Sequence, residues 1–216
     1  MENKEERKLT EAEKARLLAF EEQVSAYEKQ GYVKKDLLIS GEKANFVGPL
    51  YGFLTVLPFI VLYFFIVPQP FSWEKRGFLH TVILLIVYFL LIILHELIHG
   101  LTWSRFTKNG FGSISFGIIW RTLNPYCCCS EPLKKSHFLA GSLMPWLVLG
   151  IIPCIAALII PSGYMLLLGV VMALSAGGDL LIVQQVLSHK TNGETLYLDH
   201  PTEIGLVCLE KDRKAD

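Results

Sequence analysis

Four long apolar segments, separated by polar or charged stretches, dominate the pattern of the chain. They cover residues 46–67, 78–101, 138–160 and 164–187. Each is close to the length of about 20 apolar residues that a helix needs to cross a bilayer. The pattern therefore predicts a mainly α, polytopic membrane protein with about four transmembrane helices.

Prolines interrupt two of these segments. Pro58 lies within the first, and Pro145 and Pro153 lie within the third. A proline lacks the N–H that a helical turn uses, so we expect both helices to be bent. Pro68 ends the first segment, and a tight turn beginning at Pro161 joins the third to the fourth.

The loop between the second and third segments, residues 102–137, has the composition of a β-hairpin. Residues 113–120 are rich in β-branched and aromatic side chains, which favour a strand. Asn124 and Pro125 form a turn signal, after which residues 126–129 can return as a second strand. We expect a small hairpin at the membrane surface between the second and third helices.

Outside the apolar segments the chain is polar. Residues 1–43 alternate acidic and basic side chains, which is typical of a solvated helix. Residues 197–201 indicate a short ordered element near the C-terminus. We therefore divide the chain into a charged helical segment (1–43), a transmembrane domain (44–209) and a polar tail (210–216).

The formal net charge is zero, so the charge does not favour a nucleic-acid partner. The placement of the basic residues is informative, because positive charge gathers in cytoplasmic loops. One predicted side carries Lys34, Lys35, Lys43, Arg105, Lys108, Arg121, Lys134, Lys135 and Lys190, and the other carries Lys75 and Arg76. We expect a multi-pass protein of the cell membrane, surrounded by lipid, with both termini in the cytoplasm.

Five cysteines are present, three of them consecutive at 127–129. An odd number without framework spacing argues against a disulfide scaffold. Neighbouring strand residues point to opposite faces, so the three cannot jointly form a CxxC knuckle. We expect reduced cysteines, with a secondary metal or redox role as the open alternative.

The second apolar segment contains the chemistry. His95 and His99 are one helical turn apart, so their imidazoles face the same way and can bracket one metal ion. Glu96 lies beside them, where its carboxylate can take a proton from an attacking water. Polar groups within a membrane span usually mark a functional pathway. The alternative is an interfacial helix end whose histidines simply meet water.

Zinc needs at least one further protein ligand. Asp179 is the only acidic residue between Glu131 and Glu194, and it follows two glycines that permit close packing or a helix break. His95 lies seventeen residues beyond Phe78, and Asp179 lies fifteen beyond the start of the fourth segment. At about 1.5 Å per residue, the two sites have nearly the same depth. Asp179 could instead be satisfied within a helix contact.

Other histidines are weaker candidates. His137 precedes the third segment and is expected at the interface, although it could line the site. His200, before a proline, is expected to be a turn residue. His189 is expected to be solvated after the fourth segment. His80 is excluded because it lies about 22 Å along the helix from His95.

The sequence HELIHG at 95–100, with Gly178-Asp179 on a later helix, resembles intramembrane zinc proteases of the site-2 protease type. It is also similar to a bacterial family of zincin-type membrane peptidases, over residues 46–209. The resemblance implies His95, His99 and Asp179 as zinc ligands and Glu96 as the catalytic base. The Gly-Gly-Asp-Leu-Leu context differs from the Asp-Gly context usual in site-2 proteases.

These features together predict a membrane-embedded zinc metallopeptidase acting on a peptide or a membrane protein. An extended substrate could pair with the edge of the hairpin, in which case Ile118→Pro should abolish cleavage without loss of zinc. The alternatives are a non-catalytic metal-binding or partner-binding membrane protein and, with less support, a metal transporter. Two imidazoles and a carboxylate suit zinc but could accept iron, cobalt or manganese.

Overall fold

A computed structural model describes residues 10–68, 78–119, 124–190 and 194–211 of the chain. The expected polar turn with Lys75 and Arg76 lies outside the described residues. Arg121 and residues 212–216 of the expected polar tail lie outside them as well.

The described chain contains three helices that are long and apolar enough to cross a membrane, or four if a bent pair counts as one span. This is consistent with a membrane protein. The helical elements are α2 (Gly48–Ile66, after a π-helical turn at Lys43–Val47), α3 (Phe78–Ser104), α4 (Lys135–Pro145), a π-helical segment (Trp146–Ile151), α5 (Ile152–Ile159), and the bent pair α6 (Gly163–Ser175) and α7 (Gly177–Ser188).

The expected irregularity of the third span takes the form of a π-helical segment. Pro145 ends α4, and residues Trp146–Ile151 continue with the wider π-helical turn before α5 begins. A proline removes one N–H from the ladder, and π-turns are a known way for a helix to absorb such a defect. Pro58 lies inside α2, which continues as one helix around it.

The fourth span bends by 51° between α6 and α7, at Ala176. Glycine allows a close contact just beyond the bend, because a Cβ at Gly177 would lie 2.0 Å from the carbonyl oxygen of Gly48. The start of α7 is thereby pressed against the start of α2. This contact fixes the position of Asp179, which lies in the first turn of α7.

We expect Gly177→Ala to lower the thermal stability of the detergent-solubilised protein. The new methyl group would meet backbone atoms of Gly48, and overpacking of this kind costs about 1–3 kcal/mol. Gly178→Ala is the matched control, since a Cβ there meets nothing within 4 Å and helical alanine is favoured over glycine by up to about 1 kcal/mol. Equal unfolding midpoints for the two variants would contradict the close contact.

Among the described residues, antiparallel strands form two sheets at one end of the helices. The larger sheet has the order β1 (Tyr32–Leu38), β6 (Gly205–Lys211), β5 (Thr195–Asp199) and β4 (Leu133–Lys134). The expected ordered element at residues 197–201 therefore includes the end of β5. Residues 32–38, within the segment expected to be helical, form a strand instead because they pair with β6 along its whole length.

The first helix, α1 (Glu11–Glu28), ends before that strand. It begins with a capping box in which the Thr10 hydroxyl accepts from the Glu13 N–H, while the Glu13 carboxylate accepts from the Thr10 N–H. Gly31 follows with a φ of 85°, a conformation that glycine adopts without a steric cost. This residue turns the chain from α1 into β1.

The smaller sheet is the hairpin predicted between the second and third spans. It comprises β2 (Ile114–Ile119, after a 3₁₀ turn at Gly110–Ser113) and β3 (Asn124–Cys129). Asn124 and Pro125 belong to β3 and do not form the turn. Proline is tolerated because Pro125 pairs with Ile118 at a position where the strand N–H points away from β2.

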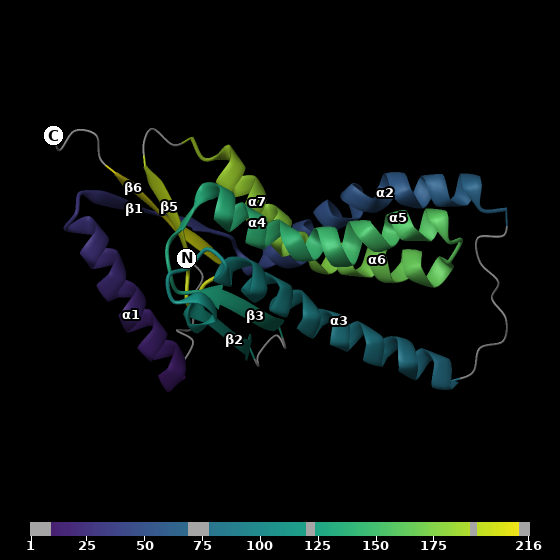
Figure 1. Cartoon of the computed structure of the whole chain (residues 1–216), viewed down its shortest axis with the longest axis horizontal. Coiled ribbons are helices and arrows are strands. Elements are labelled where there is room, and N and C mark those ends of the chain that lie inside the picture. Colours follow the sequence, from purple (N-terminus) through teal and green to yellow (C-terminus); the bar gives the residue numbers. More distant parts are fainter. Residues whose placement is uncertain (1–9, 69–77, 120–123, 191–193, 212–216) are drawn as a thin grey trace.

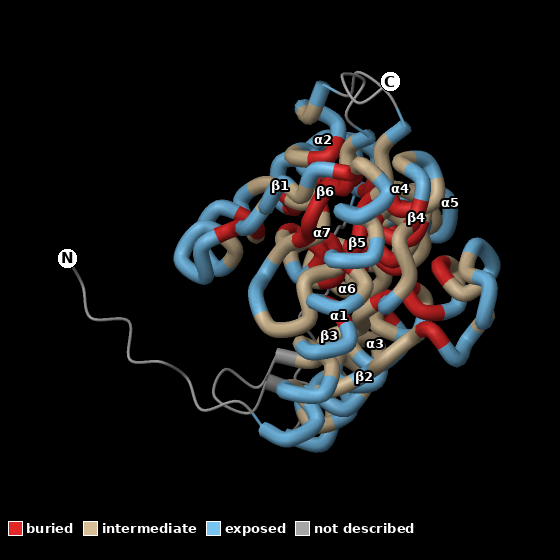
Figure 2. The backbone as a smooth tube through the Cα atoms, turned by 90° about the vertical axis from the view of Figure 1, so that its left-hand side faces the viewer, coloured by how far each residue is buried: buried red, intermediate tan, exposed pale blue. Residues whose placement is uncertain are grey.

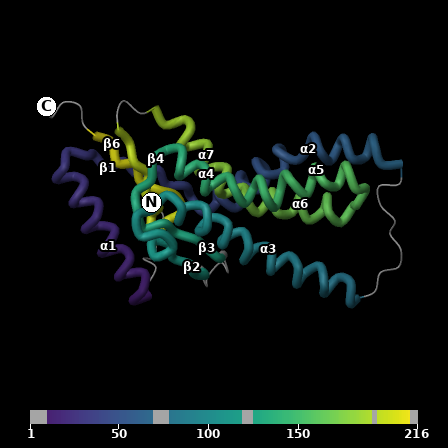
Figure 3. Tube along the Cα trace, viewed as in Figure 1, coloured from purple at the N-terminus to yellow at the C-terminus, as the bar shows by residue number. Residues whose placement is uncertain are grey.

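Within the described part of the chain, three buried clusters connect these elements. One lies among α2, α5 and α6, one joins α1 to the larger sheet, and one joins α3, α4 and α7 to that sheet. Buried segments gather around β5, β6 and α7 (Figure 2). By contrast, α3 contacts α4 near its end but runs apart from α2 and α5 over its first half (Figures 1 and 3).

Candidate metal centre

Two histidines near the end of α3 form the first part of the site. His95 and His99 are 6% and 3% exposed, and their Nε2 atoms lie 3.1 Å apart. Their separation of four residues places both rings on one face of α3, as predicted. Two imidazoles are therefore buried at one point within a helix that is otherwise largely apolar.

Asp179 brings the third group to the same point. Its Oδ2 lies 3.0 Å from the Nε2 of His95 and 3.4 Å from the Nε2 of His99. The bend at Ala176 and the contact of Gly177 with α2 position this carboxylate in the first turn of α7. The structure thus brings Asp179 next to His95, which lies 84 positions earlier in the sequence. This agrees with the prediction that the two residues have nearly the same depth along their helices.

Neighbouring groups orient the His99 ring so that its Nε2 is available to a metal ion. Its Nδ1 lies 2.9 Å from the carbonyl oxygen of Gly141, so the Nδ1–H donates and the Nε2 keeps its lone pair. The ring stacks on Trp103 at a centroid distance of 5.1 Å, and the Trp103 Nε1–H donates to the carbonyl oxygen of Phe138. These contacts hold the imidazole in one orientation.

The three groups fit a zinc ion. Their nearest ligand atoms all lie within 4.8 Å of one another, and they comprise two imidazole nitrogens and a carboxylate oxygen. Catalytic zinc sites use three protein ligands of these types and leave a fourth position for water or substrate.

Glu96 lines the same cavity from the neighbouring position on α3. Its carboxylate accepts a hydrogen bond from the backbone N–H of Cys127 on β3. The hairpin therefore orients the side chain predicted to move protons.

The cavity around these groups has a volume of about 1220 Å³. It extends from Tyr88 and Ile92 on α3 to the sheets and the first helix. Arg16 of α1 stacks over the Tyr126 ring at 5.1 Å, so α1 lies beside the cavity. Besides the groups already described, the lining includes Leu17, Asn45, Pro49, Tyr88, Ile92, Pro125, Tyr126, Cys127, Cys128, Met172 and Asp199.

Asp199 is a lining residue that the sequence did not single out. It ends β5, and its Oδ2 accepts a hydrogen bond of 2.9 Å from the backbone N–H of Cys129. Burial raises the pKa of this carboxyl to about 7, and the bond from Cys129 opposes part of the increase. Only the pairing of β5 with distant strands brings Asp199 to the cavity, so no local sequence signal identifies it.

The other predicted histidines do not join the three convergent groups, although His200 lines the same cavity. His137 stacks on Phe106 at 4.1 Å, and His200 is a turn residue whose Nδ1 accepts the N–H of Glu203. His80 packs against Tyr164. His189 is not solvated as expected: its side chain is only 15% exposed, because β6 packs against the end of α7 and surrounds the ring with polar groups.

The cysteines are free thiols, and the consecutive three lie in β3. Burial raises the pKa of the Cys127 and Cys128 thiols, and it raises the pKa of Cys129 to about 12. Neutral thiols are poor nucleophiles.

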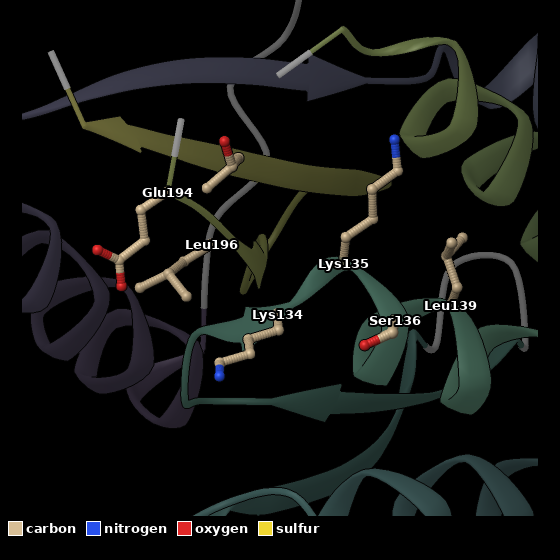
Figure 4. Close-up of a pocket in the computed structure, with 7 residues that line it drawn as sticks. Lys134, Lys135, Ser136, Leu139, Glu194 and Leu196 are labelled. Carbon is tan, nitrogen blue, oxygen red and sulfur yellow. The ribbon is translucent and has the colours of Figure 1, made fainter. Parts of the chain in front are cut away.

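A smaller pocket of about 560 Å³ lies where β4 and the start of α4 face β5 (Figure 4). Its lining comprises Lys134, Lys135, Ser136, Leu139, Glu194, Thr195 and Leu196. With no histidine or cysteine among these residues, the pocket offers no match to the His–His–Asp group.

Residues 88–193 match the model of a protein family described as "Putative zincin peptidase". The matched segment contains His95, Glu96, His99 and Asp179 together. The match supports a zincin-type peptidase family, with zinc as its cofactor and peptidase activity as its function. Searches among curated proteins and among solved structures found no match.

Proposed function

We propose that the chain is a membrane-embedded zinc metallopeptidase, similar in mechanism to site-2 proteases. In this proposal His95, His99 and Asp179 hold the zinc ion, and Glu96 is the general base. The observation that carries it is the convergence of two Nε2 atoms and one carboxylate oxygen inside a membrane-spanning helix bundle. Polar groups in such a position are costly, and they usually mark a functional site.

The residues of the chain have separate tasks in this reaction. Zinc, when bound, supplies a Lewis acid that polarises the scissile carbonyl and lowers the pKa of water. Glu96 accepts the proton of the attacking water and returns it to the leaving amine. The N–H of Cys127 keeps the Glu96 carboxylate in the cavity, and the His99 bond to Gly141 keeps its ring oriented.

Chelation tests this function directly. We expect 1,10-phenanthroline to abolish cleavage of casein or a fluorogenic peptide by the detergent-purified protein, and added Zn²⁺ to restore it. The reason is that the reaction needs the Lewis acid held by the three ligands. Zinc content and cleavage should be measured on the same samples. Undiminished cleavage by protein shown to be free of metal would contradict the proposal.

The hairpin supplies a strand to which an extended substrate can pair. The Ser130 N–H donates a hydrogen bond to the Ser113 carbonyl, so the N–H groups of every second residue along β3 point toward β2. The N–H groups of Cys127 and Cys129 consequently point the other way, toward Glu96 and Asp199. A substrate must unwind before cleavage, and pairing with this edge of β3 would hold it extended beside the zinc site.

This geometry revises the test that the sequence suggested. Ile118 lies on β2, and its N–H points away from β3 on the edge remote from the cavity. We expect Cys127→Pro to lower kcat, because the N–H that holds Glu96 is lost. It should also raise the KM for a peptide about tenfold, because the proline ring disrupts pairing at this edge, with unchanged zinc content. Ile118→Pro is the control and should leave KM unchanged. A fall in kcat alone, or equal effects of both prolines, would contradict edge pairing.

A further inference from the structure

A second cluster of metal-binding side chains lies where the end of α7 meets the larger sheet. His189 directly follows α7, while Cys208 and Glu210 lie two residues apart on β6 and therefore share one face of that strand. The nearest ligand atoms of the three lie within 4.8 Å of one another. None of these residues belongs to the cavity of the first site.

Their contacts converge on one nitrogen. The Nε2 of His189 contacts the Oε1 of Glu210, and the Sγ of Cys208 lies 3.4 Å from the same Nε2 and 3.8 Å from the same Oε1. The imidazole Nε2–H and the Cys208 S–H can both donate to the same Oε1 of Glu210, so one carboxylate oxygen serves two donors. A cation bound among the three atoms would satisfy all of them.

Neighbouring lysines hold the cluster in place. Lys35 of β1 pairs with the other carboxylate oxygen of Glu210, which leaves Oε1 facing His189. Lys135 donates to the backbone carbonyl of His189 at 3.3 Å; its side chain extends from the start of α4 (Figure 4). Partners of this kind orient metal ligands in proteins.

Burial also suits a metal site. Cys208 is fully buried, whereas the side chains of His189 and Glu210 are 15% and 18% exposed. The cluster is therefore closed on its sulfur side and open to solvent on the other. A water molecule can reach the open side as a fourth ligand.

We propose that His189, Cys208 and Glu210 form a second zinc site, separate from the His–His–Asp site. A thiolate, an imidazole and a carboxylate are the ligand types that zinc prefers, and thiolate disfavours calcium or magnesium. A bound ion would fasten the end of α7 to β6. Since α7 carries Asp179 in its first turn, this second ion would stabilise the helix that serves the first site.

Cobalt substitution distinguishes the two sites, because only the second contains sulfur. We expect the full-length protein loaded with Co²⁺ to show a near-ultraviolet thiolate-to-cobalt band, and loaded with Zn²⁺ to hold about two ions per chain. Cys208→Ser should abolish the band and reduce zinc to about one ion. His95→Ala should keep the band and lose the other ion.

Two further variants keep the test decisive. His189→Gln changes a partly exposed side chain, so it should lower cobalt affinity at this site even if Cys208→Ser folds poorly. Cys154→Ser removes a buried thiol in α5 and should leave the band unchanged. A cobalt band that persists in Cys208→Ser would overturn the second site. So would a parent protein that shows no band and holds one zinc per chain, and His189 and Glu210 would then form only an ion pair.

Discussion

Glu96→Gln is expected to lower peptide cleavage by about 10²- to 10⁴-fold while zinc stays bound. The magnitude is that of a lost general base, since glutamine cannot accept the proton of the attacking water. Zinc should remain because Glu96 is not one of the three convergent groups. The measurement is cleavage and zinc content of the same purified sample.

Glu21→Gln is the matched control for this change, because Glu21 is exposed on α1 and should affect neither quantity. The result also separates the peptidase from the alternatives. A non-catalytic metal-binding protein or a metal transporter would keep its biological effect without Glu96. Cleavage that survives Glu96→Gln unchanged would assign the general base to another group.

Much of the membrane part could be predicted from local pattern. The apolar segments locate the spans, and the β-branched residues of 113–120 locate the hairpin, because both signals lie within short stretches of sequence. His95 and His99 follow from helical spacing alone. Asp179 required one step more, the comparison of depth along two helices, and the structure places its carboxylate 3.0 Å from His95.

The larger sheet could not be predicted in this way. Tyr32 pairs with Lys211, and Leu38 pairs with Gly205, at the opposite end of the sequence. The pairing partner of such a strand is far away in the sequence, so the strand itself shows only the weak alternation of a short, half-exposed segment. For the same reason the sequence does not identify Asp199, and the expectation that His189 is solvated is wrong, since strands from distant parts of the chain create their surroundings.

Asp179→Asn is expected to weaken zinc binding at the first site by more than about 100-fold and to abolish cleavage with it. Loss of an outer-shell partner alone costs about 10- to 100-fold, and Asp179 is proposed as a direct ligand. The amide keeps the size of the side chain but removes the negative charge beside His95 and His99. Asp36→Asn, on the exposed face of β1, is the control.

Zinc affinity of these variants should be measured by competition with a chromophoric chelator, with Cys208→Ser as the common background so that only the first site is observed. If the zinc affinity of Asp179→Asn were undiminished, the third zinc ligand would have to be another residue. Asp199 would then be examined first, because it lines the same cavity, whereas His137 is stacked on Phe106. The contrast with Glu96→Gln is the decisive feature: one carboxylate should be needed for the metal, and the other only for the reaction.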